Sequence, residues 1–183
     1  SAIFFASPHG HGMAARDSPP HPTQAQLAEL ARALGRIPSG LFVLTAEHED
    51  RRAGMLVSWV QQMCFQPPML SVAVGKGRPI MPLISESRRF GLCQLGDDDK
   101  LLMRKFAGGV ELDEDPFLGL ELVHGGGVEV PVLANAMAYM ECVLACHLDV
   151  EGDHDLFVGQ IVGGKLNRAV DPKIHIRTNG LRY

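Results

Sequence analysis

Apolar residues recur with a period of two in several short runs along the chain, and this pattern predicts a mainly β protein. In the clearest run, residues 138–150, the residues on one face are Met140, Cys142, Leu144, Cys146, Leu148 and Val150. Other extended runs fall at residues 40–45, 53–65, 69–75, 90–95, 156–163 and, more weakly, 173–183. Because these runs do not alternate with helical patterns in a βαβ rhythm, we expect a closed antiparallel β-barrel with a few flanking helices.

The segment 40–68 is expected to form the first strand pair of this barrel. A first apolar run ends at Thr45, a charged loop follows, and a second run continues from Ala53 to Phe65. Two extended runs around a short polar loop are typical of an antiparallel pair. The second run carries Ser58 and Gln62 among apolar residues. Such polar groups either find hydrogen-bond partners or face a ligand.

Helical patterns precede and interrupt the strands. Thr23 and Gln26 fit a capping box, and an apolar stripe of helical spacing follows at Leu27, Leu30, Ala31 and Leu34. We expect this helix to pack on the barrel or on a partner subunit. A second helix is predicted over 98–106, with its acids in the first turn, and a short one over 79–86. Residues 108–131 predict a long excursion with little regular structure.

The first 22 residues are rich in Pro, His, Gly and Ser and predict a disordered tail ahead of one domain, residues 23–183. Met13 is a candidate natural start, in which case residues 1–12 would not be native. The 183 residues, 46% hydrophobic and 21% charged, are typical of one globular domain. A net charge of −4 favours neither nucleic acid nor an anionic membrane as partner.

The four cysteines have no zinc-type spacing, so no metal site is predicted. No apolar run approaches the roughly 20 residues that a spanning helix needs, and we expect a cytoplasmic protein with reduced, buried thiols. Cys142 and Cys146, roughly 13 Å apart in a strand, are expected to lie in the core. The sequence contains no GxSxG, HExxH, P-loop or GxGxxG motif. His147 is interpreted as a surface or strand residue rather than a general base.

Nine motifs, spread in order over residues 34–183, together resemble the flavin reductase-like family of FMN-binding split barrels. Within that family the chain is most similar to the flavin reductase-like module at the C-terminal end of flavodiiron proteins. The motifs are GLFVLTA (40–46), GMLVSWVQQMCFQPP (54–68), SVAVGKGR (71–78), RFGLCQL (89–95), LLMRKFAGG (101–109), DPFLGLE (115–121), PVLANAMAYMEC (131–142), GDHDLFVGQIVGG (152–164) and HIRTNGLRY (175–183).

This resemblance implies a closed split barrel that binds FMN without a covalent link, at the interface of a homodimer. It places His154 near the nicotinamide of a hydride donor; the alternative for His154 is a turn residue bonded to Asp153 or Asp155. The candidate FMN-binding residues are Met55, Leu56, Val57, Ser58, Trp59, Gln62, Lys76, Arg78, Cys93, Leu95, Arg104, Lys105, Phe106 and Tyr183.

These candidates have different expected roles. Ser58 is the best side chain for a hydrogen bond to the flavin or its phosphate, and Trp59 is either a core anchor or a wall of the site. The cations expected near the phosphate, each with a solvated surface charge as alternative, are Lys76, Arg78, Arg104 and Lys105. The family often has Asn where Cys93 stands, and a thiol cannot donate an amide hydrogen bond to the ring.

The leading hypothesis is an oxidoreductase in which NADH or NADPH passes a hydride to FMN, while the protein supplies position and electrostatics. Reduced flavin would then serve free flavin, oxygen, a monooxygenase or a diiron module. One alternative is an FMN electron-transfer module reduced by a protein donor. The other is a barrel that binds a ligand without catalysis.

Overall fold

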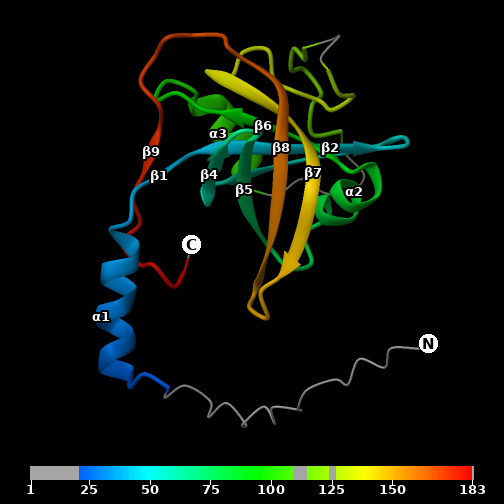
Figure 1. Cartoon of the computed structure of the whole chain (residues 1–183). Helices are drawn as coiled ribbons and strands as arrows, with labels where there is room; N and C mark the ends of the chain where they lie inside the picture. Colours follow the sequence, from blue (N-terminus) through cyan, green and yellow to red (C-terminus); the bar gives the residue numbers. More distant parts are fainter. Residues whose placement is uncertain (1–20, 109–114, 124–126, 183) are drawn as a thin grey trace, which may run out of the picture.

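The computed structural model describes residues 21–108, 115–123 and 127–182. Most of the predicted tail, residues 1–20, and Tyr183 lie outside the described residues. The chain is mainly β with three helices in the described part (Figure 1). In order, the elements are α1 (Gln24–Gly35), β1 (Ser39–Gly40), β2 (Phe42–His48), β3 (Arg51–Val57), β4 (Val60–Phe65), β5 (Pro68–Gly75), α2 (Ile80–Ser87), β6 (Arg89–Gln94), α3 (Lys100–Ala107), β7 (Ala138–Asp149), β8 (His154–Leu166) and β9 (Ile174–His175).

The larger sheet is antiparallel and has the strand order β3-β2-β6-β7-β8-β5-β4. It is not closed, so the predicted closed barrel is wrong in this respect. The predicted strand 53–65 is in fact two strands, because the chain leaves β2 after Val57 and pairs with β5 from Val60 onward. Since β3 and β4 each pair with a different neighbour, they form the two edges of the sheet, with Ser58 and Trp59 between them.

The strands separate two hydrophobic clusters, as a period of two requires. Phe42 and Leu44 of β2 belong to the first cluster, together with buried residues of β5, β6, β8 and α2. Val43, between them, belongs to the second cluster, with Cys93 of β6 and Phe106 of α3. Both faces of the sheet are therefore covered by hydrophobic residues at β2 and β6.

Helix α1 has the predicted capping box, since the Thr23 hydroxyl accepts from Gln26 N and the Gln26 side chain accepts from Thr23 N. Its apolar stripe does not pack on the sheet, because Leu27, Leu30 and Leu34 are 38%, 43% and 37% exposed. Figure 1 shows α1 standing away from the strands. Gly180 joins its C-terminal end to the rest of the chain by donating to the Ala31 carbonyl at 2.6 Å.

The acids expected in the first turn of α3 precede the helix instead, and the helix begins at Lys100. Arg168 donates to Asp98 and Asp99 at 2.7 and 2.6 Å, and Lys173 donates to Asp97 at 2.6 Å. These three carboxylates therefore form ion pairs with the segment that follows β8 instead of lying in the first turn of α3. The predicted lack of regular structure in 108–131 is confirmed where the structure describes this range.

The alternation along β7 holds only as far as Leu144. A register shift between Leu144 and Cys146 moves the later residues, and Cys146 is exposed rather than in the core as predicted. A bulge of this kind adds one residue and changes the face that follows it. Cys142 is buried, as expected. No helix in the described ranges is long and apolar enough to cross a membrane.

Candidate functional site

Trp59 and His154 form an aromatic pair, with ring centroids 4.7 Å apart and planes inclined by 44°. Trp59 lies between the two edge strands, and its carbonyl accepts from Ala73 N at 3.0 Å. His154 is the first residue of β8 and pairs with Gly75 at the end of β5. Two predicted site residues that are 95 positions apart in the sequence are therefore in contact.

The His154 ring is oriented by its neighbour in the turn. Its Nδ1 lies 2.8 Å from Asp153 Oδ1, and this hydrogen bond lowers the pKa of the Asp153 carboxyl. An ionised carboxylate only accepts, so Nδ1 carries the proton and Nε2 is left as the second ring position for chemistry. His154 therefore makes the hydrogen bond to Asp153 that was the alternative to a role in the site, and it also contacts Trp59.

Gly75 lies beside the side chains of His154 and Arg78. A Cβ at Gly75 would lie 3.7 Å from His154 Nε2 and 3.8 Å from Arg78 Nε. Arg78 is exposed, and no ion pair of its guanidinium occurs within the described residues. A cation and an imidazole beside a residue without a side chain can receive an anionic or planar group.

Two further groups complete this end of the molecule. The Ser58 side chain, beside Trp59 in the chain, belongs to a residue that is 2% exposed. The Arg177 guanidinium lies 5.1 Å from the Trp59 ring centroid, a cation–π contact. Arg177 also donates its backbone N–H to the Gly35 carbonyl at 3.0 Å, so it connects the end of α1 to Trp59.

Lys76 does not stand free beside these residues. Its Nζ is 2.7 Å from Asp149 Oδ1 and 3.6 Å from Asp155 Oδ1. The hydrogen bond to Asp149 raises the pKa of Lys76. Its charge is therefore already compensated, unlike that of Arg78.

The other predicted FMN-binding residues lie on several elements away from the contact of Trp59 with His154. Three of them, Cys93, Leu95 and Phe106, are 0–1% exposed in the second hydrophobic cluster. Their side chains are enclosed by other apolar residues, so we do not assign them direct contacts with a ligand. The remaining predicted residues are half-buried on β3 (Met55 and Leu56), buried on β3 (Val57), or exposed on β4 and α3 (Gln62, Arg104 and Lys105). Lys105 Nζ donates to the Leu118 carbonyl at 3.0 Å.

The sequence reasoning missed Gly75 and Arg177 as members of this site. Gly75 stands between a buried strand residue and Lys76 in SVAVGKGR, and a glycine at a strand end can mark a close approach. Nothing in the spacing of residues 175–183 indicated the contact of Arg177 with Trp59, because it depends on the path of the last segment. In the described part of the chain, no three His, Cys, Asp or Glu side chains gather in a way that could hold a metal ion.

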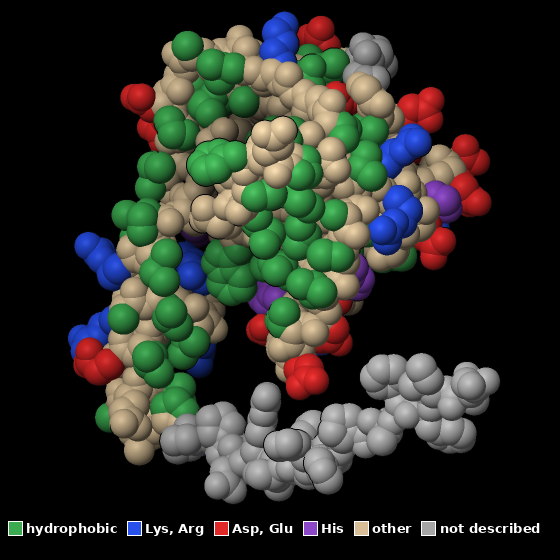
Figure 2. Space-filling model, in the orientation of Figure 1, with side chains coloured by type: hydrophobic (Ala, Val, Ile, Leu, Met, Phe, Trp, Pro, Cys, Tyr) green, Lys and Arg blue, Asp and Glu red, His purple; other side chains and the backbone are tan. Residues whose placement is uncertain are grey.

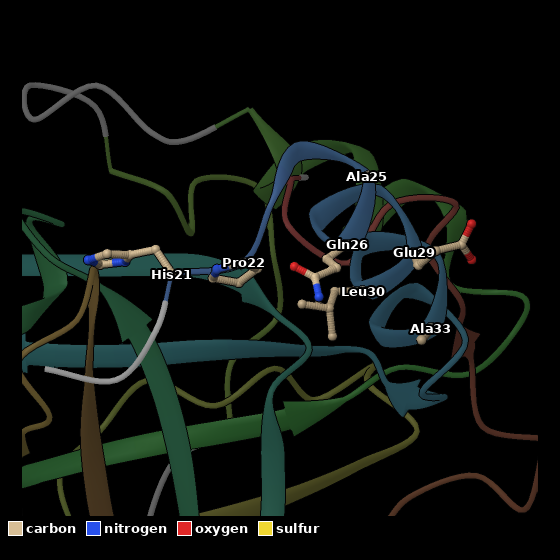
Figure 3. Close-up of a pocket in the computed structure, with 7 residues that line it drawn as sticks. All are labelled: His21, Pro22, Ala25, Gln26, Glu29, Leu30 and Ala33. Atoms are coloured by element: carbon tan, nitrogen blue, oxygen red, sulfur yellow. The ribbon is translucent and has the colours of Figure 1, made fainter.

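A hollow elsewhere runs along α1 and contains none of the predicted site residues (Figure 3). Its lining residues are His21, Pro22, Ala25, Gln26, Glu29, Leu30 and Ala33. It is bordered by the helix face that the sheet leaves uncovered, and we treat it as part of that face.

Thiol reactivity is expected to follow burial. Burial raises the pKa of Cys93 and of Cys142 to about 12, so neither forms an appreciable thiolate near pH 8. We expect both to resist iodoacetamide in the folded protein and to react fully in urea, as peptide mass spectrometry would show. Alkylation of either one at the rate of Cys146 in folded protein would contradict this prediction.

Comparison with known proteins defines the family of this chain. A family model described as "Flavin reductase like domain" matches residues 34–180, and the chain belongs to this family. The chain is 34% identical over 158 residues to diflavin flavoprotein A 1 of Synechocystis, covering 85% of this chain and 27% of the relative. It therefore spans about a quarter of the length of this curated relative.

Solved structures agree on the fold. The styrene monooxygenase flavin reductase of Pseudomonas putida superposes with a TM-score of 0.69 at 27% identity, covering 83% of this chain and 93% of that chain. The NADH:FAD oxidoreductase SgcE6 of Streptomyces globisporus has a TM-score of 0.74 at 24% identity, covering 84% and 88%. At this lower identity, the second likeness supports the fold alone.

Proposed function

We propose that this chain binds FMN and acts as an NADH- or NADPH-dependent flavin reductase. The observation that carries the proposal is the contact between His154 and Trp59 beside Gly75 and Arg78. These residues lie in motifs by which the chain resembles the family, and the structure brings them together from three separate segments.

The residues at this end of the molecule fit a flavin. Trp59 offers an aromatic wall, Gly75 lets a ligand approach the backbone closely, and Arg78 offers a cation suited to a phosphate. Bound FMN would supply the hydride acceptor. In this proposal Arg78 holds the phosphate, Trp59 limits where the ring can lie, and the Asp153–His154 pair orients the incoming nicotinamide. Exclusion of water and orientation are the protein's contributions.

A second candidate function is an FMN electron-transfer module fed by a protein donor. It is favoured by the likeness to a diflavin flavoprotein of which this chain covers only 27%. In such an assembly the electron acceptor would be a diiron module, whereas a free-standing reductase would serve a monooxygenase or free flavin. We expect either form to work in the cytoplasm.

Anaerobic absorption spectra test the proposal. FMN-loaded protein should lose its flavin bands quickly on addition of one equivalent of NADH or of NADPH, and the faster nucleotide would define the specificity. Binding of FMN without bleaching by either nucleotide would favour the electron-transfer module. Absence of FMN binding would favour the third hypothesis, a protein that binds a ligand without catalysis.

We also propose that the chain works as a homodimer in which the uncovered face of α1 meets a second copy. Leu27, Leu30 and Leu34 stay 37–43% exposed along one stripe. Figure 2 shows further hydrophobic side chains gathered over the sheet. Among the residues of the sheet, Met63 of β4 is 54% exposed and Val162 of β8 is 45% exposed. Exposed apolar surface of this kind is typical of an interaction site.

Replacement of Leu30 by Asp is expected to shift the protein toward monomer, because a charge in a buried interface is left unpaired. Light scattering after gel filtration measures the mass directly. Arg32→Gln is a matched control on the same helix, since the Arg32 side chain is 71% exposed, does not line the hollow along α1, and pairs only with Glu29 of its own helix among the described contacts. A wild-type monomer at micromolar concentration would contradict the dimer proposal.

A further inference from the structure

The lysine that the sequence assigns to a flavin phosphate lies within a network of carboxylates. Lys76 Nζ is 2.7 Å from Asp149 Oδ1 and 3.6 Å from Asp155 Oδ1. Asp155 is 7% exposed, and its Oδ2 lies 2.8 Å from His147 Nε2. The His147 ring stacks on Phe157, with centroids 4.3 Å apart and planes 9° apart. The network thus extends from the surface cation to the first hydrophobic cluster, which includes Phe157.

The same lysine is also fixed through its backbone. Lys76 N donates to the Asp153 carbonyl at 2.9 Å, next to His154. The residue before it, Gly75, pairs with His154, and Arg78 follows two positions later. Lys76 therefore ties residues 75–78 to the β7–β8 hairpin, residues 147–155, by one main-chain and two side-chain contacts.

The charges around Lys76 argue against a phosphate at this position. Asp149 and Asp155 both lie within 4 Å of the Lys76 ammonium, so an added phosphate would have to share it with two carboxyl groups. The hydrogen bond to Lys76 lowers the pKa of Asp149, and the bond to Asp149 raises the pKa of Lys76. The pair is therefore charged throughout the neutral range, and it is lost as the pH falls through the lowered pKa of Asp149 or rises through the raised pKa of Lys76.

We propose that Lys76 is a positioning residue of the flavin site, which fixes the hairpin that carries His154 against the segment that carries Arg78. This proposal rests on the proposed function, since it concerns how the same site is held. It assigns the phosphate contact to Arg78 and removes Lys76 from it. Asp149, Asp155 and His147 become supports of His154 rather than isolated surface groups.

The test compares Lys76→Met, Lys76→Arg and Asp149→Asn, with Lys165→Met as control because Lys165 is an exposed lysine of β8. Flavin dissociation constants are measured for FMN and for riboflavin, which has no phosphate. Positioning predicts that Lys76→Met and Asp149→Asn both weaken both ligands, by about tenfold for Lys76→Met, since small displacements at such sites are costly. Lys76→Arg should restore most of the affinity.

Direct phosphate binding by Lys76 predicts a different response of riboflavin and of Asp149→Asn. Lys76→Met would then weaken FMN and leave riboflavin unchanged, and Asp149→Asn would tighten FMN by releasing the ammonium. Either result overturns the proposal. Circular dichroism and gel filtration identify a variant that fails to fold, and in that case Lys76→Arg and Asp149→Asn decide the question.

A second measurement needs no flavin. Trp59 is the single tryptophan of the chain and contacts His154, so its fluorescence reports the hairpin. Acrylamide quenching of Trp59 should rise in Lys76→Met and Asp149→Asn and stay unchanged in Lys165→Met. If the wild type binds no flavin but quenching changes in this way, the proposed function fails and the positioning role stands. Unchanged quenching in both network variants would overturn the positioning role even if flavin binds.

Discussion

Replacement of His154 by glutamine is expected to slow the reduction of bound FMN by NADH or NADPH about a hundredfold, because loss of orientation at a reacting centre has effects of this size. Glutamine keeps a polar side chain but loses the ring that lies 4.7 Å from Trp59. It also loses the Nδ1 contact with Asp153 at 2.8 Å, which orients the imidazole. Stopped-flow bleaching of the flavin bands under anaerobic conditions measures the rate.

The expected loss is specific to the nucleotide. Dithionite, which needs no nicotinamide site, should reduce the flavin of His154→Gln and of wild type equally. His48→Gln is a matched control, since His48 ends β2 on the far side of the sheet order from β8 and is not among the proposed site residues. A His154→Gln variant with the wild-type NADH rate would remove His154 from the site and favour the electron-transfer module.

Much of the fold follows from local patterns. The strands at 69–75, 90–95 and 138–150, the capping box at Thr23 and the short helix near residues 80–87 were all predictable, because period and caps act over a few residues. The family was predictable as well, and the family match over residues 34–180 confirms it.

The errors in the sheet share one cause, which is that the sequence period does not show which strands pair. The sequence pattern of residues 53–65 is that of one extended segment. In the structure its two halves pair with β2 and with β5, and the sheet stays open. The bulge before Cys146 is likewise invisible in a regular alternation. Both depend on contacts between strands that lie far apart in the chain.

The candidate site shows the same limit for charges. Lys76 and Arg78 look equivalent in the sequence as cations after a strand. The structure distinguishes them, because the β7–β8 hairpin brings Asp149 and Asp155 close to Lys76. No carboxylate of the described residues lies within ion-pair distance of Arg78. Whether a cation is available to a ligand is decided by tertiary neighbours that lie some 70 residues away.

Gly159→Ala is expected to lower the free energy of unfolding by about 1–3 kcal/mol, the usual cost of overpacking a filled core. Gly159 lies on β8 opposite Leu70 and Leu144, and a Cβ there would stand 2.4 Å from Phe90 Cζ and 2.9 Å from Cys142 Cβ. Phe90 is fully buried and cannot withdraw without moving its neighbours. Urea unfolding should show a lower midpoint with an unchanged slope.

A control and a second-site variant make this prediction specific to the clash with Phe90. Gly108→Ala should be neutral or slightly stabilising, because nothing lies within 4 Å of its Cβ position and alanine restricts the unfolded chain. If the aromatic ring is the obstacle, Phe90→Leu and Gly159→Ala combined should destabilise by less than the sum of the single changes, since shortening Phe90 clears the new methyl group. Additive losses would instead place the cost in the β8 backbone or at Cys142, and an unchanged midpoint for Gly159→Ala alone would mean that β8 can move away from β6.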